Sequence, residues 1–150
     1  MINLQSIKQG AQLRAPRIVL LGVEKIGKST FAAGADRPIF LPIRQEEGVD
    51  DLDVAKFPTL QNFNQVREAL GTLAKEDHDF KTVVIDSASA LEPIIYGDVC
   101  ETEKAASIEK VGGGYGKGYT EALSRWRELM QALDYLREHK GMASVIIGHV

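Results

Sequence analysis

One segment near the start of the chain restricts the fold more than any other. Residues 22–29 read Gly-Val-Glu-Lys-Ile-Gly-Lys-Ser, which is the spacing G-x-x-x-x-G-K-S, and they directly follow the apolar run Ile18–Leu21. An apolar strand, a glycine-rich turn and the first turn of a helix are the three parts of a phosphate-binding loop, or P-loop. The backbone N–H groups of such a loop surround a polyphosphate, and the helix dipole adds partial positive charge. The segment therefore predicts an α/β fold with a nucleotide site.

The P-loop also predicts roles for individual residues. We expect the Lys28 ammonium to reach the β- and γ-phosphates of ATP and the Ser29 hydroxyl to ligate Mg²⁺. The residues predicted to bind the nucleotide are Gly22, Val23, Glu24, Lys25, Ile26, Gly27, Lys28, Ser29 and Thr30. An ordinary glycine turn between a strand and a helix is the alternative, but the fixed positions and their flanking elements together favour nucleotide binding.

A second apolar run ends in an acid. Residues 82–86 read Thr-Val-Val-Ile-Asp, and open α/β sheets bind their ligands at the carboxyl ends of the strands. This is the Walker B pattern, in which we expect Asp86 to hold Mg²⁺ through water. An acid that only marks the end of a strand is the alternative, and the P-loop upstream favours the metal role. The predicted metal ligands are therefore Ser29 and Asp86.

Further positions are candidates for ATP hydrolysis. Glu46 and Glu47 follow the second predicted strand, where a carboxylate can polarise the attacking water. Adjacent acids in a loop are often only solvated, so we predict Glu46 as the base and keep Glu47 as its substitute. His149 ends the last predicted strand, on the same edge of the sheet as Lys28 and Asp86. There a histidine could sense the γ-phosphate through a hydrogen bond, although a terminal histidine often has no such role.

The composition limits the classes of protein to which the chain can belong. With 150 residues, 44% hydrophobic and 26% charged, the chain suits one globular domain with a substantial core. No apolar run is long enough to span a membrane. Cys100 is the only cysteine, which excludes an intrachain disulfide and a cysteine-rich metal site and favours a reducing cytoplasm. The net charge of −3 gives no general attraction to nucleic acid, so any DNA contact needs a local surface.

Strands and helices are predicted to alternate along the chain. We expect strands at 17–21, 39–43, 52–57, 81–86 and 144–148, and helices at 28–33, 62–73, 89–100 and 119–138. The apolar face of the last helix is predicted to contain Leu123, Trp126, Met130, Leu133 and Leu136. Ser89 is the predicted cap of the preceding helix. Residues 101–118 carry charges and then the glycine-rich stretch 112–118, which is predicted to form a flexible loop.

This alternation indicates a three-layer α/β fold, in which a mostly parallel sheet carries helices on both faces. We divide the chain into an N-terminal lead-in arm, residues 1–16, and an ATP-binding domain, residues 17–150.

Five segments together resemble the RecA-like P-loop ATPases encoded by bacteriophages, which are grouped with single-strand annealing or recombination proteins. The matching segments are GVEKIGKST at 22–30, EEG at 46–48, VVIDS at 83–87, YGKGY at 115–119 and VIIGHV at 145–150. The P-loop and the strand aspartate are shared by many families, whereas the YGKGY loop before Trp126 and the closing GHV are more specific. The resemblance spans nearly the whole chain and implies a RecA-like core.

The same resemblance implies residue roles and partners. Lys28 and Ser29 would contact phosphate and Mg²⁺, and Asp86 would hold the metal. Glu46 would activate water, and His149 would act as the sensor. The resemblance also implies a homo-oligomer that binds ATP or ADP and acts with single-stranded DNA in phage recombination or replication, in the cytoplasm of the host cell.

Two features depart from the family pattern. Arg44 and Gln45 stand where relatives have a small polar residue before the acid turn, which leaves the choice between Glu46 and Glu47 open. Relatives continue past the His-Val strand, whereas this chain ends at Val150. We therefore expect a domain that is incomplete after the strand that ends in His149. The chain would then be a truncated form, a fragment, or a protein that a partner chain completes. The P-loop strand would then lie at an unprotected edge of the sheet.

Other functions also fit the sequence. A P-loop kinase acting on a nucleotide or another small molecule is one, but no arginine-rich lid follows the central helix, and the glycine-rich loop has a single lysine. A module that senses ATP without turnover is another. Residues 112–118 could bind DNA through Tyr115, Tyr119 and Lys117, or could be a mobile connector between two helices.

Overall fold

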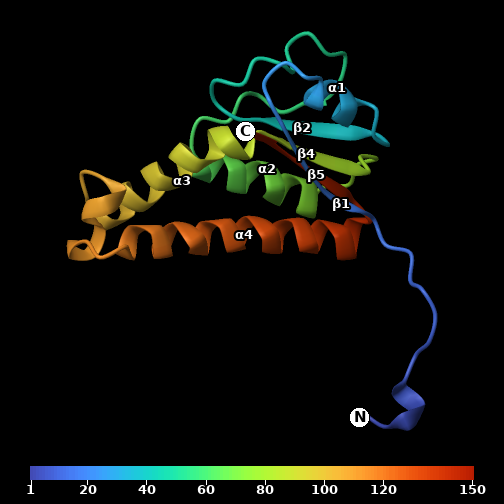
Figure 1. Cartoon of the computed structure of the whole chain (residues 1–150). Helices are drawn as coiled ribbons and strands as arrows, with labels where there is room; N and C mark the ends of the chain where they lie inside the picture. The colour runs from blue at the N-terminus through green and yellow to red at the C-terminus, as the bar shows by residue number, and fades with distance from the viewer.

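Five parallel strands form one sheet at the centre of the molecule (Figure 1). The computed structural model describes residues 1–150. The strands are β1 (Arg17–Gly22), β2 (Pro38–Pro42), β3 (Ala55–Lys56), β4 (Thr82–Asp86) and β5 (Ala143–His149). Their order across the sheet is β1-β5-β4-β2-β3, so the P-loop strand β1 lies at one edge, as predicted. The strand that comes last in sequence, β5, lies between β1 and β4.

Helices cover both faces of this sheet and confirm the predicted three-layer α/β fold. The helices are α1 (Lys28–Ala33), α2 (Phe63–Lys75), α3 (Ala88–Glu103) and α4 (Lys117–Lys140), with short 3-10 helices η1 (Leu4–Ser6) and η2 (Ile108–Gly113). The short α1 lies on one face, and α2, α3 and α4 lie on the other (Figure 1). None of the helices is both long enough and apolar enough to cross a membrane.

The two faces of the sheet bury unequal amounts of apolar surface. All five residues of β4 are buried, with Val83 and Ile85 on one face and Val84 on the other. The face under α2, α3 and α4 belongs to a core of 21 buried residues, whereas the face under α1 belongs to a core of 6. A strand covered on both faces needs a continuous apolar run, and this is why β4 could be found in the sequence. The larger core positions the long helices and leaves the carboxyl ends of the strands open.

The residues before β1 extend away from the sheet (Figure 1). At the base of this arm, Arg14 pairs with Glu138 at 3.1 Å, and the carbonyl oxygen of Ala15 accepts a hydrogen bond from Arg137 at 2.7 Å. Residues 1–13 form one hydrogen bond to a residue outside this range, from Arg14 to Oε1 of Gln12 at 3.3 Å. The arm is therefore attached to α4 only through its last residues.

The helix after β4 does not begin at the predicted cap. Ser87, and not Ser89, is the N-cap of α3, because the Ser87 hydroxyl accepts a hydrogen bond from the backbone N–H of Ala90 at 3.1 Å. A single extended residue is enough to lead the chain from the strand into the helix. The Ser89 hydroxyl instead accepts a hydrogen bond from the backbone N–H of His149 at 2.9 Å and so joins α3 to β5.

The segment 101–118 contains the end of α3, all of η2 and the start of α4, so the flexible loop predicted at 112–118 is reduced to the residues 114–116 between η2 and α4. Val111 is buried in the core and anchors η2. Gly118 packs against η2 so closely that a Cβ atom there would lie 2.0 Å from the carbonyl oxygen of Ile108. Tyr115, between η2 and α4, is fully exposed. One buried valine and one tightly packed glycine thus order a segment whose composition resembles a loop.

The apolar face predicted for the last helix is wrong at two positions. Leu123 and Met130 are 46% and 40% exposed, whereas Leu129, which was outside the predicted face, is buried. Leu133 and Leu136 are buried as predicted. Helical periodicity allows two neighbouring stripes on α4, and we infer that its close contact with η2 decides which of them faces the core.

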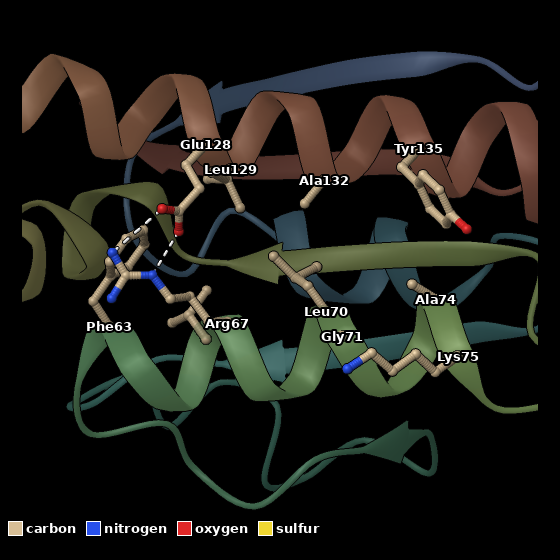
Figure 2. A pocket seen from close by; sticks show the side chains of 11 residues that line it. Phe63, Arg67, Leu70, Gly71, Ala74, Lys75, Glu128, Leu129, Ala132 and Tyr135 are labelled. Atoms are coloured by element: carbon tan, nitrogen blue, oxygen red, sulfur yellow. Dashed lines mark hydrogen bonds and ion pairs between the residues drawn. The ribbon is translucent and has the colours of Figure 1, made fainter.

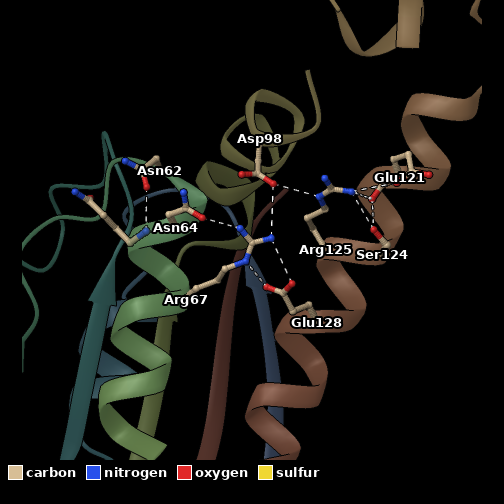
Figure 3. A network of polar contacts seen from close by, with 9 residues as sticks. Asn62, Asn64, Arg67, Asp98, Glu121, Ser124, Arg125 and Glu128 are labelled. Carbon is tan, nitrogen blue, oxygen red and sulfur yellow. Dashed lines mark hydrogen bonds and ion pairs between the residues drawn. The ribbon is translucent and has the colours of Figure 1, made fainter. Parts of the chain in front are cut away.

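Four charged side chains join the three long helices, and we call them the helix network (Figure 3). Arg67 on α2 bonds Glu128 on α4 at 2.6 Å and lies 3.7 Å from Asp98 on α3. Arg125 on α4 bonds the same Asp98 at 3.2 Å. The hydrogen bond to Glu128 is the largest cause of a raised pKa of Arg67, so this guanidinium stays charged. The network fixes the helices on one face of the sheet relative to one another.

Candidate functional site

The predicted P-loop has the geometry that its glycines require. β1 ends at Gly22, and α1 begins at Lys28. Gly27 has φ of +104°, in the left-handed region that glycine adopts without steric cost. A Cβ atom on Gly22 would lie 3.2 Å from the side chain of Ile26, closer than most side-chain contacts. The two glycines therefore allow the turn and its close packing, respectively.

Lys28 lies inside the curve of the loop. Its residue is 7% exposed, and its Nζ donates hydrogen bonds to the carbonyl oxygens of Gly22 at 2.8 Å and Val23 at 2.5 Å. No carboxylate lies within ion-pair distance of this ammonium. The charge of Lys28 is thus held next to the loop backbone and is not neutralised by an acid.

The two predicted metal ligands meet across 57 positions of sequence. The Ser29 hydroxyl donates a hydrogen bond to Oδ2 of Asp86 at 2.6 Å. Burial is the largest cause of a raised pKa of Asp86, and the nearby Glu46 carboxylate raises that pKa further. The hydrogen bond from Ser29 and the charges of His149 and Lys28 oppose this shift. Asp86 is therefore a carboxylate whose ionised form a cation would stabilise.

The oxygen ligands present here fit Mg²⁺ better than a metal that needs a full protein cage. No three His, Cys, Asp or Glu side chains in the structure are grouped so as to hold a metal ion. Mg²⁺ usually keeps several waters and takes one or two carboxylates together with phosphate oxygens. Ser29 and Asp86 can supply this small set of ligands.

Glu46 lies at the centre of a second group of hydrogen bonds. Its Oε1 accepts a hydrogen bond from the Ser87 hydroxyl at 2.5 Å and lies 2.8 Å from Nε2 of His149. The side chains of Glu46 and His149 are 19% and 23% exposed, so both are largely enclosed. Glu46 follows β2, Ser87 follows β4 and His149 ends β5, so all three residues lie at the carboxyl edge of the sheet. We call Lys28, Glu46, Asp86 and His149 the site cluster.

Three members of the site cluster, Lys28, Glu46 and His149, line a hollow of about 390 Å³ that no apolar side chain lines, and Asp86 reaches it through its contact with Ser29. The lining residues are Glu24, Lys25, Gly27, Lys28, Ser29, Thr30, Gln45, Glu46, Glu47, Gly48 and His149. Backbone N–H groups, hydroxyls and charged groups thus converge on one open space. Such a lining suits a highly charged ligand rather than an apolar one.

A family model of the AAA domain matches residues 14–149. The chain belongs to the AAA domain family. No curated protein matches it. The family consists of P-loop ATPase domains, which agrees with the loop geometry and with the parallel sheet.

The remaining residues predicted for the site lie outside the site cluster of this AAA domain. Glu47 also lines the hollow, but its residue is exposed and its side chain forms no hydrogen bond, so the structure separates it from Glu46. Val23 and Ile26 are 55% and 67% exposed and do not line the hollow. Thr30 follows Ser29 on α1 and lines the hollow.

Sequence reasoning gave too little weight to Ser87. This residue follows the Walker B aspartate directly, and the VVIDS segment was a signal that could have identified it. Gly48 was also missed: a Cβ atom there would lie 3.6 Å from the Ser29 hydroxyl. Ser87 thus contacts the predicted base Glu46, and Gly48 lies against the P-loop residue Ser29.

A second hollow in the AAA domain has a different character. It lies between α2 and α4, has a volume of about 360 Å³, and is lined mostly by apolar side chains (Figure 2). Leu70, Leu129 and Ala132 lie along it, and the Arg67–Glu128 pair closes one end. It contains none of the predicted site residues. We therefore place the candidate functional site at the P-loop.

Proposed function

We propose that this AAA domain binds ATP with Mg²⁺ and hydrolyses it. The observation that carries the proposal is the contact between Ser29 and Asp86, beside a hollow that also exposes the Glu46 carboxylate. A P-loop serine and a strand aspartate in contact are the pair that holds Mg²⁺ in P-loop ATPases. Binding of ATP does not require a general base, whereas hydrolysis does, and the Glu46 carboxylate on the same hollow can serve as that base.

Each residue would have a separate task. The loop backbone and Lys28 would bind the β- and γ-phosphates, and Ser29 and Asp86 would orient the metal. Bound Mg²⁺ would neutralise charge that develops on the phosphate oxygens. Glu46 would accept a proton from the attacking water, with Oε2 free because both hydrogen bonds fall on Oε1. Glu47 is the weaker candidate for this step, since no contact orients it.

His149 would report the state of the site. Its Nε2 bonds Glu46, and its backbone N–H bonds Ser89 on α3. In the register of the sheet it pairs with Gly22, the last residue of β1. A change at the γ-phosphate that moves Glu46 would therefore also displace His149, and through it β5 and α3.

A finer proposal concerns the biological setting. We propose that the protein is a RecA-like homo-oligomer that acts with single-stranded DNA in phage recombination or replication. The resemblance in residues 115–119 and 145–150 supports this, as does the full exposure of Tyr115, which leaves its ring free to stack on a base. We also propose that residues 1–16 are a separate arm and that residues 17–150 form the ATP-binding domain.

Phosphate release from ATP tests both levels of the proposal. The purified protein should release phosphate from ATP only when Mg²⁺ is present, and single-stranded DNA should raise the rate. Release that needs no Mg²⁺ would contradict the assignment of Ser29 and Asp86. Stimulation by nucleosides instead of DNA would favour a kinase, and binding of ATP without release would favour a sensing module.

A further inference from the structure

We propose that Ser87 is a positioning residue, which holds the Glu46 carboxylate in the orientation that water activation requires. The inference rests on the proposed ATP hydrolysis and adds a residue whose hydroxyl contacts neither the nucleotide loop nor Asp86. It is carried by the hydrogen bond from Ser87 Oγ to Glu46 Oε1, which is 2.5 Å long and joins β4 to the loop after β2.

The hydroxyl proton of Ser87 has one available direction. A serine hydroxyl has a single proton to donate and two lone pairs that accept. The Ala90 N–H donates to this oxygen at 3.1 Å and so occupies a lone pair, because it caps α3. The other close partner is the carboxylate of Glu46, which can only accept when ionised. The proton of Ser87 therefore points to Glu46.

Ser87 is itself held rigidly. It is fully buried (0% exposed), follows the last residue of β4 and precedes the first residue of α3. Its position is thus set by the central sheet and by a helix of 16 residues. A group anchored in this way can restrict a loop side chain, whereas an exposed serine would move with it.

Both donors act on the same carboxylate oxygen. Ser87 and the Nε2 of His149 approach Oε1 of Glu46, at 2.5 Å and 2.8 Å. An ionised carboxylate accepts at both of its oxygens, so two bonds on Oε1 fix the plane of the group and leave Oε2 for another donor. The attacking water is the donor that the proposed reaction requires there.

The neighbouring residue makes this arrangement specific to the site. Asp86, which would orient Mg²⁺, and Ser87, which orients Glu46, are consecutive in the chain. The groups on the metal side and on the water side are therefore set by one strand end, and their relative positions do not depend on the P-loop. A displacement of about 1 Å between reacting groups can lower a rate by as much as about 100-fold.

The test compares Ser87→Gly with Ser87→Thr. Glycine removes the hydroxyl but is tolerated at an N-cap with little loss of stability. Threonine restores the hydroxyl. We expect Ser87→Gly to lower kcat for ATP about 10- to 100-fold with a change in KM of less than about threefold, and Ser87→Thr to recover most of the loss. Equal kcat in Ser87→Gly and the unaltered protein would overturn the inference.

Asn62→Gly is the matched control for the loss of a helix cap. Asn62 caps α2 through a hydrogen bond from the Gln65 N–H at 2.9 Å and lies outside the site. We expect this variant to lose a similar amount of thermal stability while keeping its kcat. If it lost kcat as Ser87→Gly does, the effect would be one of stability and the positioning role would be wrong.

A double variant tests whether Ser87 acts through Glu46. In a Glu46→Gln background, adding Ser87→Gly should change the residual rate by less than about twofold, because the group to be positioned is already lost. Independent, multiplying losses would overturn the inference. Absence of hydrolysis in the unaltered protein would instead refute the proposed function and the inference together, so the two failures can be told apart.

Discussion

The site cluster and the helix network each contain four charged or titratable side chains, but their charges are arranged in opposite ways. In the helix network every acid contacts an arginine, and Asp98 contacts two. In the site cluster the two acids lie near one another, so that Glu46 raises the pKa of Asp86, and Lys28 bonds only backbone carbonyls. Charges that cancel within the protein serve the fold. Charges that do not cancel remain available to a cation and a phosphate.

The two hollows likewise differ in the polarity of the side chains that line them. The groove between α2 and α4 is mostly apolar, whereas the hollow at the P-loop has no apolar lining residue at all. Their volumes are similar, about 360 Å³ and 390 Å³, so size does not distinguish them. The arrangement of polar groups does, because a triphosphate needs donors and a metal rather than an apolar wall.

The strongest test of this comparison removes the unpaired charge of the site cluster. Lys28→Ala should weaken ATP binding by about 100-fold or more, since each charge-assisted hydrogen bond to phosphate contributes roughly 1.5–3 kcal/mol. Titration of a fluorescent ATP analogue measures the affinity. Lys75→Ala, at the apolar groove, is the control and should bind ATP as the unaltered protein does. Unchanged affinity in Lys28→Ala would refute the assignment of the site.

The second test removes the shared acid of the helix network. Asp98→Ala leaves Arg67 and Arg125 without a common partner, and Asp98 and Arg125 have side chains only 15% and 12% exposed. We expect the free energy of unfolding in urea to fall by roughly 2–3 kcal/mol, somewhat less than for a fully buried pair. ATP affinity should not change. A loss of affinity as large as the loss of stability would show that the two clusters are not independent.

A third change tests the packing that supports the helices. Gly118→Ala would bring a Cβ atom within 2.0 Å of the Ile108 carbonyl oxygen, so backbone must shift. We expect a destabilisation of about 1–2 kcal/mol, because overpacking exceeds the gain of roughly 1 kcal/mol in helix propensity. Thermal unfolding measures it. A more stable variant would mean that η2 moves freely, as the glycine-rich sequence predicts.

The smallest effect concerns the stability of the site cluster itself. Because the pKa of Asp86 is raised in the folded protein, the folded state favours the protonated carboxyl. That contribution is complete below the unfolded pKa of about 3.9 and is lost as the pH rises through the folded value. Asp86→Asn should therefore unfold at a higher temperature than the unaltered protein at pH 7, in EDTA and without nucleotide.

Melting curves at several pH values give the check for Asp86→Asn. The advantage of the variant should shrink as the pH falls through the raised folded pKa of Asp86, because below it both proteins carry a neutral group at this position. A difference that stays constant with pH would mean that charge is not its cause.

Much of the site could be predicted because the rules for it are local. The P-loop spacing and the acid at the end of 82–86 are short patterns, and parallel strands bring their carboxyl ends to one edge. The choice between Glu46 and Glu47 could not be made in this way. It depends on a turn in which Gln45 adopts φ of +71°, and on contacts with Ser87 and His149 that are distant in sequence.

The helix network and the ordered structure of residues 101–118 also could not be predicted from the sequence. Arg67 and Glu128 are 61 positions apart, and surface-like charges give no sign of their partners. Val111 and Ile108 are the only large apolar residues in 101–114, and two residues among charges and glycines are too few for a helical period to mark them. Predictable features here have a repeating or fixed spacing, and the others arise only when distant segments meet.

The position of β5 has a consequence for how the protein acquires its site. β1 pairs only with β5, and residues 143–149 follow β1 by more than 100 positions. During synthesis, at roughly 5–20 residues per second, the P-loop strand must wait several seconds for its one neighbour in the sheet. Contacts of such long sequence separation form slowly, because the loop they close is large. We expect β2 and β4 to pair first and the nucleotide site to appear only in the last folding step, when β5 enters between β4 and β1.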